Sequence, residues 1–230
     1  IPGATAPSTV AGAIIQRLLY VWLKYLIHQL KRPGAPIILC GAHGRMDMST
    51  GVNIYAAPER LMTQFALSSI YQYFGIPTWG FGGCTDAQIL DGQAGMEFAM
   101  LAQWASLCGI NLSHDTGYMG SGMIGDLKAI VFNDEIIGSV RHLLCNGIKV
   151  DNETKAIDVI KRVGPGGNFL SDEHTLSHFR KEFWHPTLLN RLNLNTWKKE
   201  GQKKLPEKLG EKVKEILKNH NLSLLSKRVR

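Results

Sequence analysis

The sequence predicts an α/β fold of the (β/α)8 TIM-barrel type, in which short parallel strands alternate with longer helices. Three short apolar runs are each followed by a stretch with helical periodicity, and polar, glycine-rich segments come after the runs. In such barrels right-handed crossovers join the strands, and the active site lies at the strands' C-terminal ends. An open doubly wound sheet would share these features. No GxGxxG phrase follows any of the runs, which favours the barrel.

A long helix and one strand–helix unit come first. In chain order we expect a helix over 10–30, a strand over 35–41 and a helix over 58–74. Pro33-Gly34 ends the first helix, Pro58 suits the first turn of the second, and Gly75 suits its end. The first helix is apolar enough to be compared with a membrane span. Its polar residues leave one apolar face, so we expect a buried or half-buried helix and no membrane span.

Two further strand–helix units and a helical region complete the expected pattern. The strands are expected over 76–82 and 110–113, and the helices that follow them over 93–107 and 124–144. Later helices are expected over 153–163, 172–183 and 205–219, with a turn at 164–167. The sequence shows no internal repeat. We therefore expect one domain, in which residues 1–197 form the C-terminal part of a barrel and residues 198–230 form a basic helical extension.

Composition places the chain among ordinary globular proteins. Its 230 residues are 44% hydrophobic and 20% charged, which is enough to bury one sizeable core. The net charge of +7 comes from residues 198–230, which hold 11 Lys and Arg against 4 Asp and Glu. This tail has no aromatic residue after Trp197, so we expect an amphipathic helix rather than a nucleic-acid-binding surface.

The cysteines and the N-terminal segment bear on the compartment. Cys40, Cys84, Cys108 and Cys145 are widely spaced, with no CxxC pair, which fits reduced thiols and a cytoplasmic protein. The start has neither the charged segment nor the cleavage site of a secretory signal. It begins with Ile1 in a loop-like run, so we expect a cut end.

The densest group of polar residues at a strand end is the glycine-rich loop at 80–93. Asp86, Asp91 and Gln93 could converge there on a polar substrate or a cation. Alternatively, Asp91 caps the helix that begins near Gln93, and Asp86 stabilises a turn. Both interpretations stay open.

Histidines follow the next strand and recur near the C-terminus. His114 stands beside Asp115, and such a pair can act as a general base. Adjacent residues of an extended chain point in opposite directions, so we do not expect these two to interact directly. His174 and His178 lie one helical turn apart, a metal-binding spacing, but no nearby residue completes a site and no metal is expected.

Many short phrases of the chain, taken together and in order, resemble the trimethylamine methyltransferase family of corrinoid-dependent methyltransferases. The phrases are Ala11-Gly-Ala13, Gln29-Leu30, Pro33-Gly-Ala-Pro36, Met46-Asp-Met48, Thr50-Gly51, Pro58-Glu59, Tyr73-Phe-Gly-Ile-Pro77, Thr85-Asp-Ala87, Asp91-Gly-Gln-Ala-Gly95, Gly117, Ser121-Gly122, Asp134-Glu-Ile136, Val163-Gly-Pro-Gly-Gly167, Phe169-Leu170, His174-Thr175 and Trp197. The resemblance implies a (β/α)8 barrel about twice this length, of which this chain is the C-terminal half. It also implies methyl transfer from a methylated amine to Co(I) of a cobamide that a separate small corrinoid protein carries.

One residue departs from the pattern of the trimethylamine-using members. In those members a pyrrolysine stands immediately before the Ser/Thr-Asp-Ala phrase, and here that position is Cys84. Members without pyrrolysine resemble enzymes for quaternary amines such as glycine betaine, which already carry the positive charge that a leaving amine needs. We therefore expect a quaternary methyl donor. Trimethylamine and a non-catalytic amine-binding remnant of the family are the alternatives.

The expected site combines carboxylates with aromatic faces, which hold a quaternary ammonium by cation–π attraction. A thiolate at Cys84 could accept the methyl group only if its pKa were lowered, and the neighbouring Asp86 would raise it. Each aromatic residue could instead serve packing. The candidate catalytic residues are Asp86, Asp91, Gln93 and Cys84, and the candidate substrate-binding residues are Trp79, Phe81, His114, Tyr118 and Glu97. The expected partners are a small corrinoid protein and further copies of the chain in a homo-oligomer.

Overall fold

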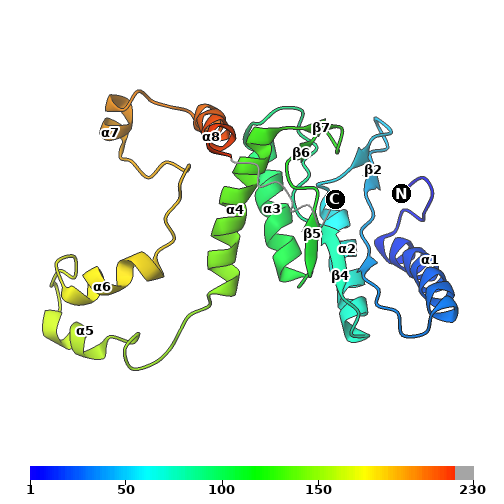
Figure 1. Cartoon of the computed structure of the whole chain (residues 1–230), viewed down its shortest axis with the longest axis horizontal. Coiled ribbons are helices and arrows are strands. Elements are labelled where there is room, and N and C mark those ends of the chain that lie inside the picture. Colours follow the sequence, from blue (N-terminus) through cyan, green and yellow to red (C-terminus); the bar gives the residue numbers. More distant parts are fainter. Residues whose placement is uncertain (221–230) are drawn as a thin grey trace, which may run out of the picture.

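A three-stranded parallel sheet of order β1-β4-β5 organises the fold (Figure 1). The computed structural model describes residues 1–220. Its central strands are β1 (Leu39–Cys40), β4 (Thr78–Phe81) and β5 (Leu112–His114). Neighbouring strands run parallel, with Trp79 beside Leu112 and Phe81 beside His114. The predicted alternation of parallel strands and helices is confirmed, while a closed barrel is not present in the described part of the chain.

Helices connect the strands and cover the sheet. Helix α2 (Pro58–Tyr73) links β1 to β4, and α3 (Gly92–Leu107) links β4 to β5. Helix α1 (Val10–Lys31) precedes the first strand, and α4 (Leu127–Cys145) follows the last. Figure 1 shows these helices in sequence order along the body of the molecule, with α3 packed on α4.

The two largest of three apolar clusters hold these layers together. The larger lies between α3, α4 and α8 (Leu205–Asn219) and is built around Phe98, Phe132 and Leu209. The smaller joins α1, α2 and β1 through Val21, Leu67 and Leu39. Because α8 packs on α4 through the fully buried Leu209, the first part of the basic C-terminal segment contacts the body. Residues 221–230 of that predicted extension lie outside the described residues.

Capping side chains explain where several helices begin, including α4, which starts at Leu127, three residues later than predicted. Asp91, Asp126 and Asp172 each accept a backbone N–H from the first turn of α3, α4 or α6 (Glu173–Glu182). Pro58 occupies the first turn of α2, as expected. Helix α8 has the predicted bounds at both ends.

Short elements account for most differences from the predicted pattern. Strands β2 (Arg45–Met46) and β3 (Asn53–Ile54) form one hairpin, and β6 (Tyr118–Met119) and β7 (Ile124–Gly125) form another. The sequence predicts loops at β2, β3 and β6, and a helix at residues 124–125, where β7 lies. Two-residue strands carry no periodicity, so tertiary pairing alone defines them.

Two boundary predictions fail for identifiable local reasons. The strand expected at 110–113 begins only at Leu112, because the Asn111 side chain accepts the Thr78 backbone N–H at 2.9 Å. The helix expected from 153 begins at Ile157, as α5 (Ile157–Val163). An Asp151–Thr154 turn, with mutual hydrogen bonds of 2.9 and 2.8 Å, occupies the preceding residues.

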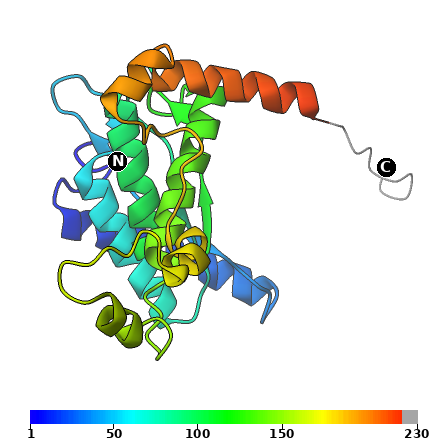
Figure 2. The same ribbon diagram turned by 90° about the vertical axis from the view of Figure 1, so that its left-hand side faces the viewer.

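The segment from α5 through α7 (Leu194–Lys199) contributes no buried helical residue. In Figure 1, α5 and α6 lie apart from α1–α4, and Figure 2 shows α5 at the end of the molecule opposite α8. The helices of this segment therefore lie outside the core, whereas Leu188, between α6 and α7, is buried in the larger cluster.

Helix α1 is the one described helix that is long and apolar enough to cross a membrane by length and composition. One side of it packs on α2, where Val21 is buried, while Leu19, Leu23 and Leu30 on its surface are exposed. The prediction of a half-buried helix is thus confirmed in part: Ala13 and Val21 are buried, and the other side of α1 is exposed.

Candidate functional site

The central sheet has one face packed against helices and one open face. Thr78 and Gly80 of β4 are buried, whereas Trp79 is 45% exposed and the neighbouring Leu112 is 52% exposed. Alternate residues of a strand point to opposite faces, and residues in register point to the same one. Trp79, Phe81, Leu112 and His114 therefore share the open face.

Three of the predicted substrate-binding side chains meet near the C-terminal ends of β4 and β5. The Phe81 and His114 ring centroids lie 4.3 Å apart, and those of Trp79 and His114 lie 5.0 Å apart. The fourth aromatic, Tyr118, belongs to β6 and is 46% exposed, and its backbone bridges to Cys84. The sheet thus gathers Trp79, Phe81 and His114 into an aromatic cluster with an accessible side.

A cation that the sequence did not point to lies against this cluster. The guanidinium carbon of Arg60, in the first turn of α2, is 3.6 Å from the Phe81 ring centroid and 4.2 Å from that of Tyr55. Arg60 is only 3% exposed, and burial lowers its pKa below the ordinary value of an arginine. One face of Phe81 is therefore already covered by a cation of the protein itself.

The loop after β4 approaches the loop after β5 closely. A Cβ on Gly83 would lie 2.9 Å from the backbone Cα of Thr116, so the approach requires glycine at this position. The next residue, Cys84, is 2% exposed. Burial raises the pKa of its thiol to about 12, with further raising by Asp115 and Asp86 and partial opposition from Arg60. A neutral, buried thiol is a poor nucleophile at ordinary pH.

Asp86 connects three loops rather than projecting freely into a pocket. Its carboxylate accepts the backbone N–H of Tyr55 at 2.8 Å and that of Ala56 at 2.7 Å. It also accepts the Ser121 hydroxyl at 2.7 Å. These contacts join the segment before α2, the loop after β4 and the β6–β7 hairpin. Asp86 therefore has a structural role, but through contacts 30 to 35 residues away rather than in the local turn of the alternative interpretation.

Glu97, a residue of α3, holds the same loop to that helix through hydrogen bonds. One of its oxygens accepts the Thr85 hydroxyl and the Asp86 backbone N–H, the latter at 2.8 Å. Its other oxygen accepts the Gln93 side-chain amide at 2.9 Å. Glu97 is buried, at 7% exposure, and these three donors satisfy its carboxylate. Glu97 and Gln93 are thus placed to support the loop.

Asp91 lies at the N-terminus of α3. Its carboxylate accepts the backbone N–H groups of Gln93 at 2.9 Å and Ala94 at 3.2 Å. This is the helix-capping role that the sequence offers for Asp91 as the alternative to a catalytic one. The structure therefore separates the predicted set into an aromatic cluster on the sheet and a carboxylate framework that shapes the loop beside it.

The expectation that His114 and Asp115 do not interact directly is wrong. His114 Nδ1 and Asp115 Oδ1 lie 2.8 Å apart. The extended-chain rule fails because Asp115 has a φ of +66°, in the left-handed region, which turns its side chain back toward the ring. A non-glycine residue in this conformation at a strand end stores local strain.

His174 and His178 pack against each other instead of converging on a third ligand. Their rings stack with centroids 4.1 Å apart, and the His178 Nδ1 atom is 2.9 Å from the His174 carbonyl oxygen. Within residues 1–220, no group of three or more His, Cys, Asp or Glu side chains is arranged to hold a metal ion.

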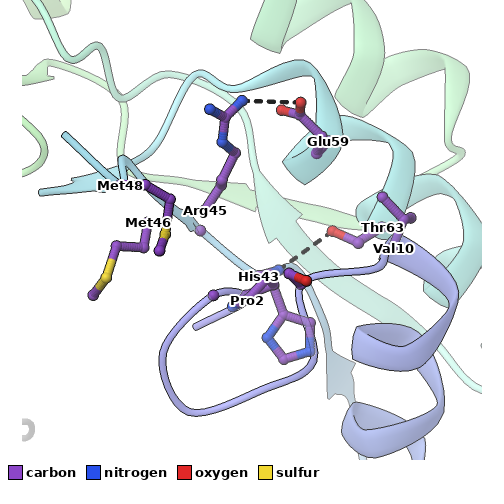
Figure 3. Close-up of a pocket in the computed structure, with 11 residues that line it drawn as sticks. Pro2, Val10, His43, Arg45, Met46, Met48, Glu59 and Thr63 are labelled. Atoms are coloured by element: carbon purple, nitrogen blue, oxygen red, sulfur yellow. Dashed lines mark hydrogen bonds and ion pairs between the residues drawn. The ribbon is translucent and has the colours of Figure 1, made fainter. Parts of the chain in front are cut away.

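A cavity of about 270 Å³ lies beside the β2–β3 hairpin, away from the aromatic cluster (Figure 3). The N-terminal loop, β2 and the start of α2 enclose it. Arg45 and Glu59 form an ion pair of 3.0 Å on one side, and Met46 and Met48 lie on another. None of the predicted site residues lines this cavity.

All 230 residues match the family described as trimethylamine methyltransferase. The chain is 33% identical over 199 residues to a glycine betaine methyltransferase of Desulfitobacterium hafniense strain Y51, covering 86% of this chain and 41% of that protein. It is 30% identical over 227 residues to a trimethylamine methyltransferase of Desulfitobacterium hafniense strain DCB-2, covering 99% of this chain and 45% of that protein.

A relative from another genus gives a similar result. The chain is 31% identical over 222 residues to a trimethylamine methyltransferase of Methanosarcina mazei, covering 96% of this chain and 44% of that protein. The chain thus spans less than half the length of each of these relatives. Together with the match over its full length, these similarities show that the chain belongs to the trimethylamine methyltransferase family.

Proposed function

We propose that the protein containing this chain moves a methyl group from a quaternary amine, such as glycine betaine, to Co(I) of a cobamide carried by a separate corrinoid protein. The observation that carries the choice of donor is the state of Cys84. By the family resemblance, Cys84 stands at the position that holds pyrrolysine in the trimethylamine-using members. Burial raises the pKa of its thiol to about 12. A side chain in this state neither activates an amine nor accepts a methyl group.

The chemistry of the leaving group connects this residue to the substrate. A tertiary amine must become cationic before it loses a methyl group, because otherwise it leaves as a strongly basic anion. A quaternary ammonium is already cationic and leaves as a neutral tertiary amine. The cobamide supplies the nucleophile when its carrier protein docks. The remaining task of the enzyme is to hold the donor and aim one methyl group, which is positioning and electrostatics.

The aromatic cluster supports this role. A quaternary ammonium offers no hydrogen-bond donor, so aromatic faces hold it, each contributing about 0.5–2 kcal/mol. The exposed side of Trp79 is available for such a contact, while Arg60 covers a face of Phe81. Asp86 and Glu97 act by fixing the loop that borders the cluster.

We propose further that the sheet is part of a (β/α)8 barrel completed by the rest of the protein. The open sheet face supports this arrangement, because Trp79 and Leu112 would pack toward the inside of a closed barrel. The exposed apolar side of α1 offers a second surface for further elements. A homo-oligomeric state and a cytoplasmic location stay predictions.

The test uses the full-length protein mixed with its corrinoid protein in the Co(I) state. Glycine betaine, carnitine, choline and trimethylamine are supplied separately, and the absorbance change on forming methyl-Co(III) is recorded. We expect methylation with a quaternary donor and little with trimethylamine. Faster methylation with trimethylamine would favour the tertiary amine. No methylation with any of the four would favour a non-catalytic member of the family.

A further inference from the structure

Arg60 is a buried cation whose charge no acidic side chain neutralises directly. It is 3% exposed, and its recorded hydrogen bond runs from Nη1 to the Tyr55 carbonyl oxygen at 3.3 Å. Its Nε atom is buried without a hydrogen-bond partner. Among residues 1–220, no carboxylate lies within 4.0 Å of its guanidinium as an ion pair. A guanidinium has five N–H donors, so most of its capacity is unused here.

The nearby carboxylates are engaged with other groups. Asp86 accepts the backbone N–H groups of Tyr55 and Ala56 together with the Ser121 hydroxyl. Asp115 pairs with His114 at 2.8 Å. Burial lowers the pKa of Arg60, and the negative charges of Asp86 and Asp115 raise it in part. Both carboxylates therefore stabilise the cation from a distance. Neither supplies the direct contact that a buried charge ordinarily has.

The two rings beside Arg60 restrict the orientation of its guanidinium. The guanidinium carbon lies 3.6 Å from the Phe81 ring centroid and 4.2 Å from that of Tyr55, and these two rings are nearly perpendicular, at 85°. A guanidinium can bind a carboxylate through two parallel hydrogen bonds. The rings thus restrict Arg60, and its N–H donors without a partner suit the oxygens of a carboxylate.

The position of Arg60 links that anion to the methyl donor. Arg60 covers Phe81, Phe81 lies 4.3 Å from His114, and His114 lies 5.0 Å from Trp79. A carboxylate on Arg60 would therefore stand at one end of the aromatic cluster, with the methylated nitrogen of the same small molecule beside the rings.

We propose that Arg60 binds the carboxylate of the methyl donor, so that the site selects zwitterionic betaines over choline and trimethylamine, which have no carboxylate. This inference rests on the proposed function for the identity of the site. It makes Arg60 a specificity residue that recognises the donor.

The test measures binding to the full-length protein by calorimetry with three probes. Glycine betaine has both charged groups, choline lacks the carboxylate, and 3,3-dimethylbutanoate keeps the carboxylate but replaces the nitrogen with carbon. We expect Arg60→Gln to weaken glycine betaine and 3,3-dimethylbutanoate by about 10- to 100-fold, the range for a lost charge-assisted contact. Choline should change by less than about twofold. Arg45→Gln, a surface arginine paired with Glu59, is the matched control and should change none of the three.

The outcomes separate recognition from packing. Equal weakening of all three probes, or no change in any of them, would overturn the proposal. Should Arg60→Gln fail to fold, the wild-type protein decides: binding of 3,3-dimethylbutanoate and preference for glycine betaine over choline support the proposal, and the reverse pattern overturns it. Because 3,3-dimethylbutanoate binding requires no methyl transfer, failure of the proposed reaction would appear separately in the methyl-Co(III) assay.

Discussion

Replacing Asp86 should loosen three loops at once. The carboxylate accepts the backbone N–H groups of Tyr55 and Ala56 and the Ser121 hydroxyl at 2.7–3.0 Å. Hydrogen bonds to a charged group contribute about 1.5–3 kcal/mol each, and bonds that share one acceptor are not additive. Because Asp86 is only partly buried, water replaces some of the lost contacts in Asp86→Ala. We expect a loss of roughly 2–4 kcal/mol in the free energy of unfolding, a range reached when a paired network is broken.

The assay combines urea unfolding of the full-length protein with hydrogen–deuterium exchange. Exchange should accelerate in peptides covering residues 53–57 and 119–123, because these segments lose their common acceptor. Asp86→Asn keeps one acceptor oxygen and should lose about half as much stability. Asp158→Ala is the control, since that side chain is 99% exposed, and it should leave both measurements unchanged. If Asp86→Ala exchanges and unfolds like the control, the loop-connecting role of Asp86 is wrong.

Four further outcomes follow from individual contacts. Asp91→Ala should lower the free energy of unfolding by about 1 kcal/mol through loss of the α3 cap, and an unchanged urea midpoint would contradict this. Gly83→Ala should cost about 1–3 kcal/mol by overpacking against Thr116, and equal stability would show that the loop yields. Trp79→Ala should raise the KM for a quaternary donor by about 2- to 30-fold, the range of one cation–π contact, and an unchanged KM would remove Trp79 from the site. Burial raises the pKa of Cys84 from 9.0 to about 12, so its share of the stability is intact below pH 9 and declines toward pH 12. Iodoacetamide should therefore alkylate folded Cys84 far more slowly than the unfolded chain at pH 8, and equal rates measured by mass spectrometry would contradict its burial.

Local chemistry made the helices predictable. Helix α8 has the predicted bounds, and α2 and α3 differ from prediction by one residue at one end, because caps and periodicity lie within the segments themselves. The strands were harder. A strand expected over 35–41 pairs only at Leu39–Cys40, since pairing depends on where β4 lies rather than on the apolar run.

The structure shows which predicted site residues lie together, and it reveals contacts among them that the sequence does not predict. The sequence pointed to the loop at 80–93 and to the aromatic residues at the strand ends, and the sheet brings Trp79, Phe81 and His114 together. Arg60 was not predicted, because nothing in its local sequence distinguishes it from any other arginine in the first turn of a helix. Its importance arises from stacking on Phe81, a contact between distant parts of the chain. The His114–Asp115 contact was missed because a left-handed residue cannot be read from residue types alone.

The central claim is that a quaternary donor needs no activating residue at the position of Cys84. The direct measurement is methyl-Co(III) formation by the full-length Cys84→Ala variant, with glycine betaine as donor and the corrinoid protein in the Co(I) state. We predict a rate within about twofold of the wild type, because a neutral buried thiol contributes no chemistry. Loss of methyl transfer in a variant that folds like the wild type would contradict the claim and return the thiol to the reaction.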